Sequence, residues 1–135
     1  YDSDYIEEVG PGLGYSAEVM RKTAMTAQAQ RDGFQAAVVK GVNVAFGTDA
    51  AVYPHGDNAK QFALYVQHGL SPAAAIQSAT RWAAELMCWD DRVGSLSAGH
   101  FADLVAVDGD PLEDVSLLET PKAVMKGGRW ISEPD

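Results

Sequence analysis

Asp49 is the residue best placed to carry out chemistry in this chain of 135 residues. It follows the apolar run Val-Asn-Val-Ala-Phe-Gly-Thr at 42–48, which predicts a short buried strand over 43–47 that leads to a carboxylate. In barrel enzymes the catalytic side chains lie where strands end and loops begin. A carboxylate in that position can bind a metal ion or accept a proton from water, so Asp49 is the candidate metal ligand and the candidate general base.

His55 is the second candidate, and it lies in the loop Pro-His-Gly-Asp-Asn at 54–58. This loop follows Asp49 on the same side of the predicted strand end. An imidazole there could contact a substrate or a transition-state oxyanion, which makes His55 the candidate substrate-binding residue. The alternative is a loop histidine that bonds only to the backbone. Either Asp57 or Asn58 is predicted to be the N-cap of the next helix.

One carboxylate does not make a metal site, because zinc sites need three or four ligands. The other histidines fall at a predicted helix end (His68) and in a predicted turn (His100), so we predict a structural role for His68 and a solvent-facing side chain for His100. Asp103, Asp108 and Asp110 are spaced a little like calcium ligands, but they lack the glycine and the distal glutamate of an EF-hand loop. Turn chemistry explains these three aspartates better.

Helices are predicted on both sides of the strand that ends at Asp49. The long segment 16–40 has apolar residues three and four apart, the spacing of one helix face. Helices over about 58–68 and 71–86 follow the strand. This alternation of helix and strand indicates the α/β class. The predicted boundary residues are Ser16 and Ser71 as N-caps, and Gly41 and Gly69 at the C-terminal ends.

Short alternating segments and glycines replace the helical pattern from about residue 92. Strands are predicted near 104–107, 123–125 and 129–131, and Gly127-Gly128 is a hairpin signal between the last two. We therefore predict two units, a helix–strand–helix region over 1–91 and a small β region over 92–135.

Charge and cysteine content restrict the function classes. The net charge of −9 argues against nucleic acid or an anionic membrane as a partner, since both require a basic surface. Cys88 is the only cysteine and lies in an apolar stretch, so we predict a small buried hydrophobic residue rather than a nucleophile. With no signal peptide in the sequence, we expect a cytoplasmic protein. The chain starts with Tyr1, so we expect it to begin partway through a longer polypeptide.

A buried strand needs hydrogen-bonded neighbours on both sides, and residues 1–90 provide one predicted strand with three predicted helices. Each buried amide left without a partner costs about 1–3 kcal/mol. We therefore expect either a homo-oligomer or completion of the fold by a larger barrel or sheet. A non-catalytic module that associates through its unpaired sheet edges is the alternative to an enzyme.

Two regions resemble the amidohydrolase superfamily of metal-dependent hydrolases, most closely the branch with imidazolonepropionase-like enzymes and Xaa-Pro dipeptidases (prolidases). The first region is Gly-Thr-Asp at 47–49 followed by the loop at 54–58. The second is a long C-terminal pattern whose order and spacing are specific. Its parts are Arg-Val-Gly-Ser-Leu at 92–96, Gly-His-Phe-Ala-Asp-Leu-Val-Ala-Val at 99–107, Asp-Pro-Leu-Glu-Asp at 110–114 and Val-Met-Lys-Gly-Gly at 124–128.

This resemblance implies the C-terminal portion of a (β/α)8 TIM barrel over 1–91 and the C-terminal strands of a small β-sandwich over 92–135. It implies that Asp49 binds a divalent metal, with zinc expected, and takes a proton from the attacking water. The reaction implied is hydrolysis of a C–N bond in a small amide, dipeptide or cyclic amide. The family's His-x-His and other metal ligands have no match here, so we expect the isolated chain to be inactive, to bind no metal, and to need the missing barrel half.

Overall fold

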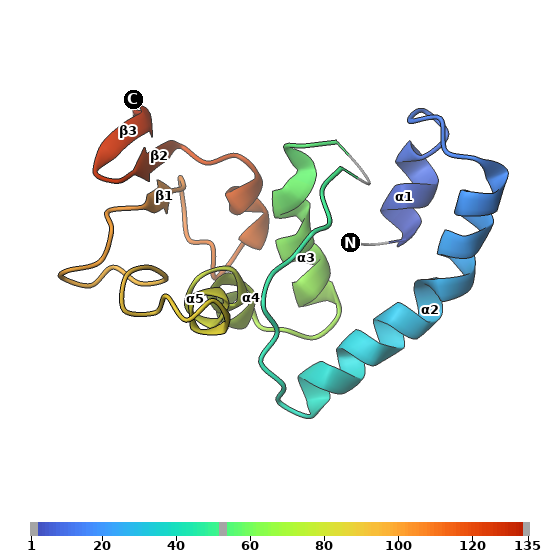
Figure 1. Ribbon diagram of the computed structural model, residues 1–135, viewed down its shortest axis with the longest axis horizontal. Helices are drawn as coiled ribbons and strands as arrows, with labels where there is room; N and C mark the ends of the chain where they lie inside the picture. The colour runs from blue at the N-terminus through green and yellow to red at the C-terminus, as the bar shows by residue number, and fades with distance from the viewer. Residues whose placement is uncertain (1–2, 52–53, 134–135) are drawn as a thin grey trace.

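The computed structural model describes residues 3–51 and 54–133, and Figure 1 shows them as a helical part joined to a small sheet. The helices α1 and α2 lie at one end, α3 lies near the middle, and the sheet lies at the other end (Figure 1). Within these ranges no helix is both long and apolar enough to cross a bilayer. The helices are α1 (Ser3–Val9), α2 (Ala17–Val39), α3 (Lys60–Gln67), α4 (Pro72–Ala79) and α5 (Arg81–Leu86), with short 3-10 turns η1 (Asp57–Ala59) and η2 (Val115–Glu119), and the strands are β1 (Leu104–Ala106), β2 (Ala123–Lys126) and β3 (Arg129–Ser132).

The predicted N-caps Ser16 and Ser71 are confirmed. The hydroxyl of Ser16 accepts the N–H of Val19 at 3.3 Å, at the first turn of α2. Ser71 does the same for the N–H of Ala74 at 3.2 Å, with Pro72 at the first position of α4. Each hydroxyl satisfies one of the backbone donors that a helix start leaves unpaired.

Replacing the Ser71 hydroxyl tests the α4 cap. We expect Ser71→Ala to lower the free energy of unfolding by about 1 kcal/mol, the usual loss for an N-cap. Chemical denaturation followed by circular dichroism measures this change. Ser71→Asp is the matched variant, because a carboxylate also accepts an N–H at this position. A similar loss in both variants would mean that the cap hydrogen bond is not the cause.

The predicted helix ends at Gly41 and Gly69 are also confirmed, and α5 ends in the same way at Cys88. In each case two backbone hydrogen bonds close the helix in the Schellman pattern. They run from Gly41 and Val42 to Val38 and Ala37, from Gly69 and Leu70 to Val66 and Tyr65, and from Cys88 and Trp89 to Glu85 and Ala84, with N···O distances of 2.9–3.1 Å.

The prediction that Cys88 is buried is wrong. Cys88 is exposed and has a φ of 56°, the left-handed conformation of the residue that follows a helix C-cap. Its neighbours Met87 and Trp89 are also exposed. The apolar stretch suggested burial, but it lies beyond the last turn of α5 and has no element of the described chain above it.

The segment predicted as one helix over 71–86 is divided at Thr80, whose φ of −120° and ψ of −93° are not helical. Gly94 packs into the junction between α4 and α5. A Cβ atom at Gly94 would lie 2.7 Å from the Cβ of Ala84 and 3.0 Å from the carbonyl oxygen of Thr80. Its φ is +88°, a conformation that favours glycine. The junction therefore requires a residue without a side chain.

The predicted strand at 43–47 is not formed, although its side chains pack as expected. The segment has no helix or strand assignment and runs from the end of α2 along α3 (Figure 1). Val44 and Phe46 contact the core residues of α3 and α4, and the N–H of Phe46 donates to the carbonyl oxygen of Ser78 at 2.9 Å. The reason is a lack of neighbours, because no described strand lies beside this segment to form a ladder.

The core gathers around Tyr65 of α3, where aromatic rings from three elements meet. Phe34 of α2 stacks on Tyr65 with ring centroids 4.8 Å apart, and Phe46 lies 4.5 Å from Phe62. Such pairs add stability beyond the area that they bury. These rings fix the segment that leads to Asp49 against α2 and α3.

The C-terminal strands form the predicted antiparallel sheet in the order β1-β2-β3. Gly127 and Gly128 make the hairpin turn with φ values of 57° and 78°, as type I′ turns require. Asp103 holds this hairpin, because its carboxylate accepts the N–H of Gly127 at 2.6 Å and pairs with Lys126. The Lys126 contact and the Gly127 hydrogen bond lower the pKa of Asp103. Turn chemistry at Asp103 is thus confirmed.

Candidate functional site

Asp49 ends the segment that packs on α3 and turns the chain outward. Its side chain is exposed and its φ is +53°. A left-handed backbone is rare outside glycine, although aspartate and asparagine adopt it more readily than most residues. Ala51, two residues after Asp49, has a φ of 102°, which is a strained conformation for a residue with a side chain. The chain therefore adopts two unfavourable conformations directly at the candidate catalytic carboxylate.

His55 lies at the tip of a turn in which the N–H of Asp57 donates to the carbonyl oxygen of Pro54 at 3.5 Å. His55 is exposed, and Gly56 beside it has a φ of 105°. The imidazole therefore faces solvent. The predicted role of His55 in binding substrate stays a prediction.

The predicted capping role of Asp57 or Asn58 is wrong. Gly56 is the N-cap of η1, and no side chain caps it. Asp57 is instead bound to two residues, because its carboxylate accepts the hydroxyl of Tyr5 and lies 3.4 Å from the ammonium group of Lys60. The Lys60 nitrogen also lies 4.7 Å from the centroid of the Tyr5 ring. Sequence reasoning missed this cluster, since its members come from α1, η1 and α3.

The three groups of this cluster shift each other's pKa. The Tyr5 hydroxyl, and then Lys60, lower the pKa of Asp57 from its ordinary value of 3.8. The hydrogen bond to Asp57 raises the pKa of Tyr5 above 10.0, against the opposing charge of Lys60. Desolvation acts to lower the pKa of Lys60, but Asp57 and Tyr5 outweigh it and raise that pKa. The contacts within this cluster are therefore strongest when the Tyr5 phenol is neutral and both Asp57 and Lys60 are charged.

This arrangement predicts a pH window for the contact. Asp57 has a lowered pKa, so its stabilisation is present above 3.8 and is lost as the pH falls through the folded-state pKa. Tyr5 has a raised pKa, so its stabilisation is present below 10.0 and is lost as the pH rises through the folded-state value. We expect Tyr5→Phe to make the thermal unfolding temperature less dependent on pH. This should hold in the acid range, where Asp57 becomes protonated, and in the alkaline range, where Tyr5 ionises. An unchanged pH dependence would contradict the contact.

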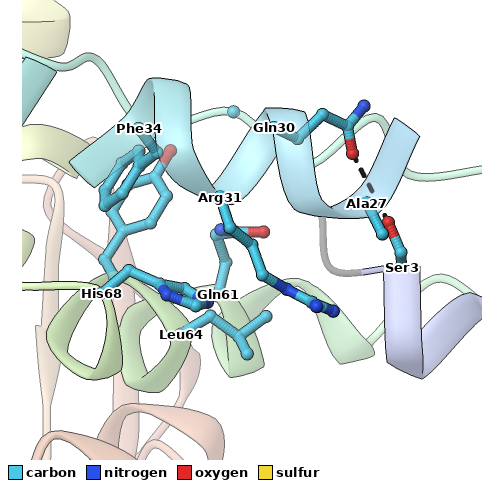
Figure 2. A pocket seen from close by; sticks show the side chains of 10 residues that line it. Ser3, Ala27, Gln30, Arg31, Phe34, Gln61, Leu64 and His68 are labelled. Carbon is cyan, nitrogen blue, oxygen red and sulfur yellow. Dashed lines mark hydrogen bonds between the residues drawn. The ribbon is translucent and has the colours of Figure 1, made fainter. Parts of the chain in front are cut away.

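A hollow of about 190 Å³ lies between α1, α2 and α3, and Figure 2 shows its lining. The hydroxyl of Ser3 donates to Gln30 at 3.4 Å across one end, and the buried Gln61 reaches in from α3 (Figure 2). Neither Asp49 nor His55 lines this space. The hollow is therefore distinct from the candidate site. It is lined by Ser3, Ala27, Gln30, Arg31, Phe34, Gly47, Gln61, Leu64, Tyr65 and His68.

His68 takes the structural position predicted for it, whereas His100 is less exposed than predicted. His68 is the C-cap of α3, with its Nδ1 3.4 Å from the Gln35 amide and its ring against the edge of Phe34. His100 is half-buried in the loop before β1, where its Nδ1 lies 3.2 Å from the hydroxyl of Ser95. Both imidazoles are held by neighbouring side chains rather than directed at Asp49.

A metal ion needs more than Asp49 supplies. Among residues 3–51 and 54–133, no three His, Cys, Asp or Glu side chains gather closely enough to hold one. The exposed carboxylate of Asp49 is a suitable single ligand, but zinc requires three or four. The described part of the chain thus does not fit a metal by itself.

Comparison with known proteins identifies the class. The sequence profile of the Amidohydrolase family matches residues 12–131, and the chain belongs to this family. Amidohydrolases in general use divalent metals. The mixed helix-and-strand structure also matches solved amidohydrolase structures. The resemblance read from the two sequence regions is confirmed.

Particular relatives refine this result. Ochratoxinase from Aspergillus niger is 34% identical over 128 residues, which cover 91% of this chain and 26% of that protein. A solved Xaa-Pro dipeptidase with bound methionine is 39% identical with a TM-score of 0.85, over 97% of this chain and 32% of that one. A prolidase complexed with N-methylphosphonate-L-proline is 27% identical with a TM-score of 0.86, over 98% and 33%. The chain thus spans about a third or less of these relatives.

Proposed function

We propose that this chain is the C-terminal part of a metal-dependent amidohydrolase that hydrolyses a C–N bond in a small amide, dipeptide or cyclic amide. Residues 1–91 would form the last β/α units of a TIM barrel, and residues 92–135 the C-terminal strands of a small β-sandwich. The relatives named Xaa-Pro dipeptidase and prolidase favour a dipeptide over the other substrates. The single cysteine favours a cytoplasmic enzyme.

The segment that leads to Asp49 carries this proposal. One side of it packs on α3 and α4 through Val44 and Phe46, as a barrel strand packs on its outer helices. No described strand pairs with it, although its sequence is apolar. A strand of the remaining polypeptide on each side would satisfy the free backbone groups. Asp49 would then lie at the carboxyl end of that strand, where barrel enzymes place catalytic groups.

We assign Asp49 two roles in the complete enzyme, as one ligand of a divalent metal, with zinc expected, and as the acceptor of a proton from the attacking water. The exposed carboxylate and its left-handed backbone support this assignment. The other ligands would come from the remaining barrel. We assign His55 to substrate binding, because its turn follows Asp49 and its ring faces solvent. The isolated chain is expected to be inactive.

A chimaera tests the proposal. This chain would replace the matched third of the Xaa-Pro dipeptidase, which has a TM-score of 0.85 to it. We expect a folded protein that hydrolyses Xaa-Pro dipeptides with added zinc and stops when a chelator removes the metal. The chain alone, at equal concentration, is the control and should show no hydrolysis. A chimaera that folds and binds zinc but hydrolyses no amide or dipeptide would contradict the proposed function.

Self-association is the second candidate, and exposed apolar side chains favour it. Leu86, Leu96 and Ile131 are 73%, 86% and 71% exposed, which is a liability for a solitary chain. The unpaired segment at 43–49 is a further edge for pairing. We expect the isolated chain to form a homo-oligomer when the rest of the barrel is absent. A stable monomer at tens of micromolar in analytical ultracentrifugation would contradict this expectation.

A further inference from the structure

The contact between Tyr5, Asp57 and Lys60 joins helix α1 to the start of η1 and α3, which lie apart in the sequence. Tyr5 belongs to α1, which precedes the long helix α2. Asp57 and Lys60 are the first residues of η1 and α3, after the loop that carries His55. The phenol and the carboxylate that it contacts are 52 residues apart in the chain. This contact therefore fixes the start of α3 relative to α1.

Each end of the contact is held by its own element. Ile6, next to Tyr5, is only 1% exposed, which anchors α1 in the packed interior. Lys60 adds an ion pair to Asp57 and lies over the Tyr5 ring, so the cation contacts both partners. The Asp57 carboxylate thus accepts a hydrogen bond from the phenol of Tyr5, which the packed helix α1 holds in place. The charge of Lys60 favours the ionised form of this carboxylate.

The position of Asp57 determines the position of the turn before it. The backbone N–H of Asp57 closes the turn onto Pro54, with His55 and Gly56 at its tip. Gly56 has a φ of 105° and no side chain, so it contributes no packing that would hold the turn. His55 is exposed and has no hydrogen bond to the described residues. Asp57 therefore links this turn to α1 and α3.

We propose that Tyr5 is a positioning residue for His55: through Asp57 and Lys60 it fixes the turn at 54–57, so that the imidazole is oriented toward the substrate. This inference rests on the proposed function of the site, and it connects Tyr5 of helix α1 to the loop that follows Asp49. Tyr5 itself contacts no substrate. Its hydroxyl acts by reducing the conformations that the turn can adopt before the substrate binds.

The first test uses this chain and needs no activity. We expect Tyr5→Phe to raise the pKa of Asp57 toward 3.8, measured by NMR titration of the side-chain carboxyl carbon. The amide signals of His55 and Gly56 should shift, with unchanged far-ultraviolet circular dichroism. Tyr15→Phe is the matched control, because it removes another phenol hydroxyl that is not among the groups shifting the pKa of Asp57. Unchanged Asp57 and His55 signals in Tyr5→Phe would overturn the contact itself.

The second test uses the chimaera described above. We expect Tyr5→Phe to raise KM roughly fivefold and to change kcat by less than about twofold. This pattern is expected when a variant loses binding energy equally for the substrate and the transition state. Asp57→Asn should have a similar effect, and the double variant should add little to either. Shifted NMR signals with an unchanged KM would overturn the positioning role. An inactive chimaera would contradict the proposed function, while the NMR test would still decide the contact.

Discussion

Asp49→Asn is expected to reduce kcat of the chimaera roughly a thousandfold, within the range that a positioned general base contributes. The amide cannot accept a proton from water, and it is a weaker metal ligand than a carboxylate. Metal content, measured by atomic emission, should fall as well. Asparagine adopts the left-handed conformation that Asp49 has, with its φ of +53°. The variant therefore removes the charge and leaves the backbone turn intact.

The matched control for this prediction is Asp108→Asn. Asp108 is also an exposed aspartate, but it lies in a bend after β1 rather than at the end of the 43–49 segment. We expect it to keep activity within about twofold of the parent, as surface substitutions usually do. Asp49→Asn with activity near that of the control would contradict both roles assigned to Asp49. If Asp49→Asn lost activity but kept its full metal content, Asp49 would still be assigned as the general base but not as a metal ligand.

The helix boundaries at Ser16, Gly41, Gly69 and Ser71 could be predicted because local chemistry determines them. Ser16 and Ser71 accept an N–H from within the next helical turn, and Gly41 and Gly69 close their helices by bonds to the preceding turn. The hairpin at Gly127-Gly128 is equally local, since two positive φ values are what a two-residue turn requires. The sequence contains everything that these features need.

Features that depend on distant partners could not be predicted in the same way. The strand expected at 43–47 has the correct side-chain pattern, but its ladder needs neighbours that the described chain does not provide. The contact from Tyr5 to Asp57 spans 52 residues, and no local pattern indicates it. The apolar character of the segment around Cys88 indicated burial, yet nothing in the described chain covers it. For the same reason Asp49 could be identified as a candidate while its partners could not.

Gly94→Ala is expected to have the largest effect on stability. The new methyl group would lie 2.7 Å from the Cβ of Ala84, 3.0 Å from the carbonyl oxygen of Thr80 and 3.2 Å from the Cα of Arg81. Two of these neighbours are backbone atoms, which cannot rotate away. Overpacking costs about 1–3 kcal/mol, and a left-handed alanine adds about 1–2 kcal/mol. We expect the free energy of unfolding to fall by about 2–5 kcal/mol in urea denaturation.

Gly99→Ala separates the two causes of this loss. Gly99 has a φ of +91°, close to the +88° of Gly94, but a Cβ there meets no atom within 4 Å. It should therefore lose only the backbone contribution, about 1–2 kcal/mol. The difference between the two variants measures how tightly Gly94 packs between α4 and α5. Equal losses of unfolding free energy in the two variants would mean that the junction accommodates a methyl group at Gly94 without strain. The close packing of Gly94 would then not hold α4 and α5 together.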